Sequence, residues 1–278
     1  MSAVSEMLSD RTVAAFRERV YAHYRDHGRH DLPWRLTRDP YAVLVSEVML
    51  QQTQVSRVAP YYEEWMERFP TPEALVAAPL EAVLRLWQGL GYNRRAVALV
   101  RAAGEIVSVH GGSMPREREA LLALPGVGPA TAAGVLAFAF GESDLYLETN
   151  VRAVFLHEFF ADAEGVPDRA ILPLVEQTLD RDDPRTWYWA LLDYGAHLKR
   201  VHPNPSRRSR HHVRQSPFEG SHRQLRARLL RAVMELPGST SEQLAAGFGE
   251  DVDRAEGALA GLVSEGFLAE EGGRYRVR

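Results

Sequence analysis

The sequence predicts an all-α fold for roughly the first 200 residues, followed by a small C-terminal winged-helix-like module, and two patterns carry this prediction. Apolar residues recur at three- and four-residue spacing through much of the chain, as in VSEVMLQQTQVSRVAPYYEEWMERF, which is typical of amphipathic helices. Alternation typical of strands appears only near the end, in GFLAEEGGRYRVR. A chain of 278 residues is long enough for two or three small domains with buried cores.

Several segments carry further helix signals. TPEALVAAP and PLEAVLRLW each open with Thr or Pro and continue with an acidic residue, which is a helix-start pattern. TAAGVLAFAF is small and apolar on every side, so we expect a buried helix there. Residues 167–198 are expected to add at least two more helices.

Composition changes at Lys199. Residues 199–221 contain three prolines, many basic residues and almost no aliphatic ones, so we expect an irregular, exposed loop. Residues 222–278 carry three helix signals and then a hairpin signal, which indicates the winged-helix-like module. The presumed third helix, DVDRAEGALAGLVSEG, is acidic, and this favours a structural or partner-docking role over DNA reading.

Composition also excludes some classes of protein. The chain has no cysteine, which excludes disulfides, zinc–thiolate sites and iron–sulfur clusters held by cysteine. MSAVSEMLSDRTVAAF carries acids and no long apolar run, so we expect no secretory signal, no membrane span and a cytoplasmic protein. The formal net charge of −4 argues weakly against a nucleic-acid partner, but a local basic surface suffices for phosphate contacts.

Two motifs carry chemistry. LPGVGPATAAGV, residues 124–135, places a Pro-Gly-x-Gly turn between helical stretches, and its N–H groups can hold a phosphate. The alternative is an ordinary helix–helix turn. Glu47 stands in the apolar run VLVSEVML. Burial there would raise its pKa and make it a proton donor near neutral pH, whereas the alternative is a glutamate on a helix surface.

These motifs resemble the helix-hairpin-helix superfamily of endonuclease III. SEVMLQQTQV is similar to its MutY-like branch of adenine DNA glycosylases nearly letter for letter, and LPWR, WQGLGYNRRA and HGGSMP are similar to it too. The resemblance implies two helical domains that flank a DNA groove. The domains we expect are residues 1–30 with 140–198, a six-helix barrel of residues 31–139 that contains the hairpin, a basic loop of 199–221, and the module of 222–278.

The resemblance also implies roles for individual residues. Glu47 would protonate the departing base, and Tyr92 would wedge into the duplex beside the flipped nucleotide. The hairpin carbonyls of Leu122, Leu124 and Val127 would hold a structural monovalent cation such as Na⁺ or K⁺. The full set of expected DNA contacts outside the basic loop is Gln51, Gln52, Tyr92, Gly126, Gly128, Thr131, Asn150 and Arg152.

The chain departs from the family pattern at two catalytic positions. Glu148 in LYLETNVRAVF replaces the aspartate that lies over the sugar in the superfamily. A carboxylate there stabilises an oxocarbenium-like sugar as the glycosidic bond breaks, and the alternative is that Glu148 only caps a helix. Ala130 replaces the lysine with which bifunctional members form a Schiff base, so we expect no lyase activity.

A third departure concerns the iron–sulfur cluster of MutY. Lys199, Ser206 and Ser209 stand where three cluster cysteines would be, so the sequence predicts neither a cluster nor any required cofactor. We expect the basic loop to contact phosphates in its place, and the alternative is a solvated charge run. Its expected contacts are Arg207, Arg208 and Arg210, with Arg214 nearby.

These roles predict a monofunctional DNA glycosylase of base excision repair. It would hydrolyse the N-glycosidic bond of a flipped adenine opposite G or 8-oxoguanine, in mismatched or damaged double-stranded DNA of the nucleoid, as a monomer. Residues 222–278 are too few for the Nudix-like domain with which MutY recognises 8-oxoguanine. The alternatives are therefore a uracil or thymine glycosylase for G mismatches, and a non-catalytic DNA lesion-binding protein.

Overall fold

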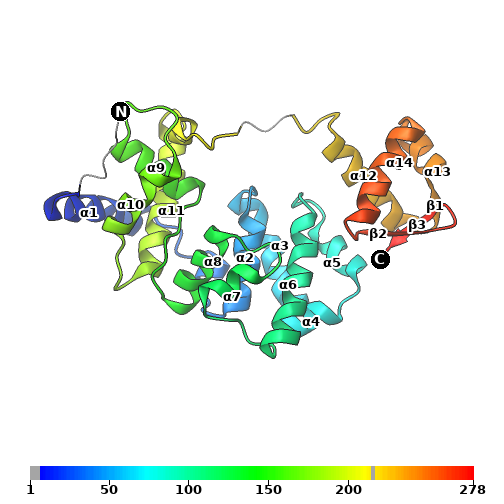
Figure 1. The fold of residues 1–278 in the computed structure, drawn as a ribbon, viewed down its shortest axis with the longest axis horizontal. Coiled ribbons are helices and arrows are strands. Elements are labelled where there is room, and N and C mark those ends of the chain that lie inside the picture. Colours follow the sequence, from blue (N-terminus) through cyan, green and yellow to red (C-terminus); the bar gives the residue numbers. More distant parts are fainter. Residues whose placement is uncertain (1–6, 214–216) are drawn as a thin grey trace. The chain divides into compact units, whose positions relative to one another are not determined.

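The computed structural model describes residues 7–213 and 217–278. These residues divide into two compact bodies, unit 1 (residues 7–48 and 114–213) and unit 2 (residues 49–113 and 217–278). Both are mainly helical, which confirms the predicted fold class (Figure 1). The units are compact bodies rather than the domains expected from the sequence, whose boundaries at residues 30 and 139 stay a prediction. No helix in the described ranges combines the length and apolarity needed to cross a membrane.

Unit 1 is built around aromatic packing between its first and last helices. The Phe16 ring lies 5.5 Å from that of Phe155 and 5.8 Å from that of Trp187, centroid to centroid. α9 and α11 run side by side over this core (Figure 1). The elements of unit 1 are α1 (Asp10–His27), η1 (Pro33–Arg35), α2 (Pro40–Leu50), α7 (Arg118–Ala123), α8 (Pro129–Val135), η2 (Leu136–Phe140), α9 (Thr149–Phe159), α10 (Asp168–Thr178), α11 (Pro184–Val201) and η3 (Pro205–Arg208).

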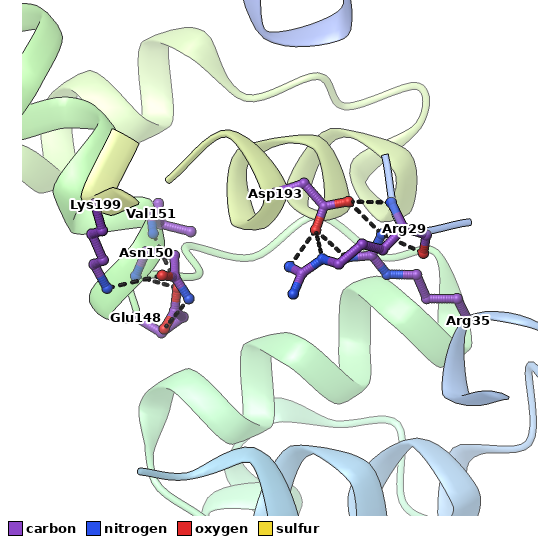
Figure 2. Close-up of polar contacts among 7 residues, drawn as sticks. All are labelled: Arg29, Arg35, Glu148, Asn150, Val151, Asp193 and Lys199. Carbon is purple, nitrogen blue, oxygen red and sulfur yellow. Dashed lines mark hydrogen bonds and ion pairs between the residues drawn. The ribbon is translucent and has the colours of Figure 1, made fainter. Parts of the chain in front are cut away.

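A buried ion-pair network ties the segment before α2 to α11. The Asp193 carboxylate accepts hydrogen bonds from the backbone N–H of Arg29 at 2.8 Å and from the two terminal nitrogens of Arg35 at 2.8 and 2.9 Å. Figure 2 shows both arginines turned toward this carboxylate. Burial would raise the pKa of Asp193, but the hydrogen bonds and charges of the two arginines hold it below its usual value. The network therefore anchors the chain that leads into α2.

Unit 2 combines four helices with the C-terminal module. Its helical part is packed around Trp65 and Trp87, whose ring centroids are 5.5 Å apart in an edge-to-face arrangement. The elements of unit 2 are α3 (Val55–Arg68), α4 (Pro72–Ala77), α5 (Leu80–Trp87), α6 (Arg94–His110), α12 (His222–Glu235), β1 (Ser239–Thr240), α13 (Ser241–Phe248), α14 (Val252–Ser264), β2 (Leu268–Glu271) and β3 (Arg274–Val277).

The C-terminal module has the three helices and the hairpin that the sequence predicts. Its antiparallel sheet has the order β1-β3-β2, with Glu271 paired to Arg274 at the hairpin and Ser239 paired to Tyr275. The short strand β1 was not expected. It forms because Thr240 both pairs with β3 and caps α13, where it and Gln243 make a reciprocal capping box.

Two segments differ from the sequence-based expectation. The helical run around residues 44–69 is interrupted between α2 and α3, where Gln52 takes a left-handed φ of 56°. Residues 199–221 are not an irregular, exposed loop throughout, because α11 continues to Val201 and η3 follows at Pro205–Arg208. Ser206 and Ser209 are buried, since η3 packs on α9. Arg214 lies outside the described residues.

Replacing Asp193 by alanine is expected to destabilise the protein strongly. The change leaves the buried Arg35 guanidinium without its carboxylate, which costs about 3–5 kcal/mol of unfolding free energy in comparable sites. Urea unfolding measures the change. The matched control is Glu81→Ala, which removes a half-exposed pair with Arg85 and should cost less than about 1 kcal/mol. Equal losses in the two variants would contradict the anchoring role of Asp193.

Candidate active site

Glu47 on α2 is enclosed by residues from two other segments of unit 1. The Tyr146 hydroxyl donates to Glu47 Oε2 at 3.3 Å. Gly134 of α8 lies so close that a Cβ built on it would be 2.3 Å from the same oxygen. The flanking α2 residues Leu44 and Val48 are buried in the core. The predicted apolar setting of Glu47 is thus formed by tertiary packing and not by α2 alone.

This enclosure favours the protonated form of the Glu47 carboxyl. Burial of the carboxyl and, to a lesser extent, the charge of Glu148 raise the pKa of Glu47 from 4.5 to about 8, although the hydrogen bond from Tyr146 acts in the opposite direction. Burial also raises the pKa of Tyr146 well above its usual value, so the tyrosine stays neutral and keeps its donor proton. At neutral pH the site therefore holds a protonated carboxylic acid, the state required of a general acid.

Tyr146 and Gly134 are site residues that sequence reasoning did not identify. Both belong to segments whose strongest local signals point elsewhere, LYLETNVRAVF and TAAGVLAFAF. The signal for Gly134 was the all-small character of its helix, which we interpreted only as burial. The structure shows a second reason for it: any side chain at residue 134 would have to displace the Glu47 carboxyl or the Tyr146 ring.

Glu148 caps the N-terminus of α9. Its Oε1 accepts hydrogen bonds from the backbone N–H groups of Asn150 and Val151, the latter at 3.0 Å. The helix-cap alternative is therefore present in the structure. It does not exclude the catalytic role, because Oε2 has only a long contact of 3.5 Å with Asn150 Nδ2. Since the charge of Glu148 acts on Glu47, the fold brings the two predicted carboxyls into one site.

Two other predicted DNA contacts on α9 have protein partners. The Asn150 side-chain oxygen accepts a hydrogen bond from Lys199 at 2.8 Å. The Arg152 guanidinium makes two hydrogen bonds of 2.8 Å to Asp168, and its side chain is 16% exposed. Arg152 therefore offers a neutralised and largely covered charge. Its expected contact with DNA stays a prediction.

The predicted DNA-facing residues of unit 2 lie in strained turns. Gln52 and Tyr92 are the non-glycine residues with positive φ in the described part of the chain, at 56° and 48°. Such conformations cost about 1–3 kcal/mol each and are found mainly at functional sites. Arg95, which sequence reasoning missed, connects the two turns by donating to the carbonyls of Gln51 at 2.6 Å and Gly91 at 2.9 Å.

The hairpin between α7 and α8 has the predicted glycine conformation. Gly126 takes a φ of 79° and Gly128 is the N-cap of α8, while Thr131 is buried. The carbonyl of Leu124 accepts the N–H of Val127 at 3.1 Å, which closes the turn. This geometry leaves the second lone pair of the Leu124 carbonyl for another partner. The expected cation at Leu122, Leu124 and Val127 stays a prediction.

Some arginines of the basic loop are exposed to solvent, and one is hydrogen-bonded to the backbone of α9. Arg207 and Arg210 are exposed, whereas Arg208 donates to the backbone carbonyl of Leu156 at 3.1 Å. No group of three His, Cys, Asp or Glu suited to a metal occurs in the described ranges.

A cluster held by thiolates does not fit the residues present. The chain lacks cysteine, and the side chains at two of the expected ligand positions make hydrogen bonds to α9. Lys199 binds Asn150, and Ser206 Oγ donates to the carbonyl of Thr149 at 3.3 Å.

Comparison with known proteins identifies similar sequences and folds. Residues 45–212 match the family described as HhH-GPD superfamily base excision DNA repair protein. The chain is 42% identical over 173 residues to the adenine DNA glycosylase of Mycolicibacterium smegmatis, covering 62% of this chain and 59% of the relative. It is 38% identical over 145 residues to the thymine/uracil-DNA glycosylase of Pyrobaculum aerophilum, covering 52% and 63%.

Solved structures include the same fold. A thermostable thymine-DNA glycosylase has a TM-score of 0.60 and 26% identity to this chain, covering 67% of this chain and 87% of that chain. The match to the two curated relatives is less complete, since the chain spans 59% and 63% of their lengths.

Replacing Glu47 by glutamine is expected to stabilise the protein at alkaline pH. Folding raises the pKa of Glu47 from 4.5 to about 8, so stability that is present below pH 4.5 is lost as the pH rises through about 8. Glutamine does not ionise and avoids this loss. We expect the Tm of Glu47→Gln to exceed that of the wild type by several degrees near pH 9 and by much less near pH 5. A difference independent of pH would contradict the assignment.

Proposed function

Because the chain belongs to the HhH-GPD superfamily of base excision DNA repair proteins, we propose that it is a monofunctional DNA glycosylase that removes adenine opposite G or 8-oxoguanine. The observation that carries the proposal is the enclosure of Glu47 by Tyr146 and Gly134, together with the nearby charge of Glu148. A binding protein has no need of an enclosed acid whose pKa is raised to about 8. The non-catalytic alternative is therefore disfavoured.

The proposed reaction uses the two carboxyls in sequence. The target nucleotide leaves the duplex, with Tyr92 and the glutamines Gln51 and Gln52 filling the gap. Glu47 then gives its proton to the base, so that the base leaves as a neutral molecule. Glu148 stabilises the positive charge that develops on the sugar. Water then adds to the sugar carbon and gives up a proton, which balances the proton that Glu47 gave to the base. The strained conformations of Gln52 and Tyr92 support a DNA role for these turns.

Adenine is favoured over the other bases by the sequence around the acid. QQTQV and the Tyr92 turn are the segments most similar to adenine glycosylases, and the Mycolicibacterium smegmatis relative is more identical over a longer stretch than the thymine/uracil one. A uracil or thymine glycosylase remains the second candidate, because the Pyrobaculum aerophilum relative carries that name. A monomer bound to mismatched double-stranded DNA of the nucleoid is part of the same proposal.

The proposal includes no lyase chemistry, and the amines of the chain support this. Ala130 occupies the position of the Schiff-base lysine, and Lys199 is the one lysine of the chain. Its Nζ donates to Asn150 Oδ1 at 2.8 Å, so this amine is engaged with the protein and is not proposed as a nucleophile.

A panel of duplexes tests the proposed substrate. We expect base release from A:8-oxoguanine and A:G duplexes, little from U:G or T:G, and a loss of at least about 10²-fold in Glu47→Gln. Single-turnover rates with excess enzyme measure the chemical step. Release of uracil or thymine faster than adenine would select the second candidate, and full activity of Glu47→Gln would contradict the mechanism.

The single-turnover rate is expected to depend on pH through Glu47. Its pKa of about 8 keeps the acid protonated at neutral pH and ionises it above that value, so the rate should fall about tenfold per pH unit in the alkaline range. DNA affinity measured in parallel separates chemistry from binding. A rate that continues to rise through pH 9 to 10 would argue against Glu47 as the proton donor.

The exposed arginines of the basic loop are expected to contribute to salt-dependent binding. Replacing Arg207 and Arg210 together by alanine should reduce the slope of log affinity against log salt by about two, because each phosphate contact contributes about 0.9. Fluorescence anisotropy with a labelled duplex measures the slope. Arg25→Ala on α1 serves as the control, since Arg25 is paired with Glu18 on an exposed surface. An unchanged slope in the double variant would remove the basic loop from the DNA interface.

A further inference from the structure

Lys199 is the only lysine in this chain, in which the other 32 of the 33 Lys and Arg residues are arginines. It lies near the end of α11, is half-buried, and has no carboxylate within ion-pair distance among the described residues. The proposed reaction assigns it no role. An ammonium group withdrawn from water in this way is costly unless its contacts compensate.

The contacts of Lys199 lead to the second carboxyl of the site. Its Nζ donates to Asn150 Oδ1 at 2.8 Å, and Asn150 Nδ2 lies 3.5 Å from Glu148 Oε2. Figure 2 shows Lys199 and Glu148 on opposite sides of the Asn150 amide. Because an ammonium can only donate, it requires the amide oxygen to face Lys199 and the amide NH₂ to face Glu148. Lys199 thus sets the orientation of the group that contacts Glu148 Oε2.

Packing between the two helices makes this contact possible. Gly195 stands one turn before Lys199 on α11, and a Cβ built on it would be 2.2 Å from the backbone carbonyl of Asn150. Only glycine permits this approach of α11 to the first turn of α9. Ser206 binds the same turn from η3 through the carbonyl of Thr149. Residues from α11 and η3 therefore hold the first turn of α9.

Electrostatics connect Lys199 to Glu148. Burial lowers the pKa of Lys199, the charge of Glu148 raises it, and Arg152 lowers it. Arg152 is itself paired with Asp168, so Glu148 is the acidic group to which Lys199 responds. The positive charge of Lys199 therefore acts in turn on the Glu148 carboxylate, the group that stabilises the sugar in the proposed reaction.

We propose that Lys199 is a positioning residue, which orients Asn150 and through it the Glu148 carboxylate. The proposal rests on the function proposed above. It also gives a reason for the misfit of an iron–sulfur cluster: at the position of a cluster cysteine this chain has a hydrogen-bond donor that binds α9 directly.

Nuclear magnetic resonance tests the contact without reference to activity. Protein grown with lysine labelled at Cε gives one side-chain signal, because the chain has one lysine. We expect its titration midpoint to lie below that of free lysine and to fall further in Glu148→Gln, since the carboxylate favours the ammonium form. A titration midpoint equal to that of free lysine, or one that is the same in Glu148→Gln as in the wild type, would overturn the proposal. This experiment uses the native lysine and remains decisive if a Lys199 variant does not fold.

A double-mutant cycle tests the consequence for catalysis. Lys199→Met should lower the single-turnover rate on the A:8-oxoguanine duplex by about 10- to 100-fold, as outer-shell substitutions do elsewhere, with DNA affinity and Tm nearly unchanged. Lys199→Gln, which keeps a donor, should recover part of the loss. In an Asn150→Ala background Lys199→Met should have little further effect.

The outcomes separate this proposal from the proposed function. Equal losses from Lys199→Met in both backgrounds, or no loss in either, would overturn the positioning role while the wild type still releases adenine. A wild type that releases no base from any duplex would instead overturn the glycosylase assignment, and the lysine titration would still decide whether Lys199 is coupled to Glu148.

Discussion

The enclosure of one carboxyl is the constraint on which the rest of the site depends. Glu47 can remain protonated at neutral pH because α8 and Tyr146 close around it, and because Glu148 adds a like charge. These neighbours come from α8 and from the segment that leads into α9, both in unit 1. The buried ion-pair network of Asp193 also supports the position of Glu47, since it anchors the chain that leads into α2. Part of the folding free energy of this protein therefore offsets the cost of enclosing the Glu47 carboxyl in apolar surroundings.

The first turn of α9 is the second focus of the structure. It presents Glu148 toward the acid and is held from behind by Gly195, Lys199 and Ser206. A capping carboxylate has a defined orientation because the helix N–H groups bind one of its oxygens. The departure from aspartate to glutamate is accommodated by this cap, which is satisfied in the structure. The basic loop is therefore partly folded and bonded to α9, and only part of it is available as a basic surface.

Unit 2 contributes a different kind of constraint. Gln52 and Tyr92 are held in left-handed conformations, and Arg95 bonds to the carbonyls of both turns. A strained backbone conformation of this kind persists only where the surrounding contacts hold it in place. The C-terminal module belongs to the same unit, and Arg223 of α12 donates to the Tyr92 hydroxyl at 3.0 Å. This contact favours the structural role expected for the module from its acidic third helix.

The sequence by itself determined the fold class, because helical periodicity is a local signal. For the hairpin turn and for Glu47 as the proposed acid, the local patterns left alternatives open, and the resemblance of LPGVG and SEVMLQQTQV to a known family favoured these assignments. The sequence also identified the three helices and hairpin of the C-terminal module. Only the tertiary structure decided what surrounds that acid. Gly134, Tyr146 and Lys199 acquire their roles through contacts between segments 50 to 100 residues apart, and no local pattern specifies which side chains meet across such distances. The interruption at Gln52 and the folded part of the basic loop were missed for the same reason, because both follow from packing rather than from composition.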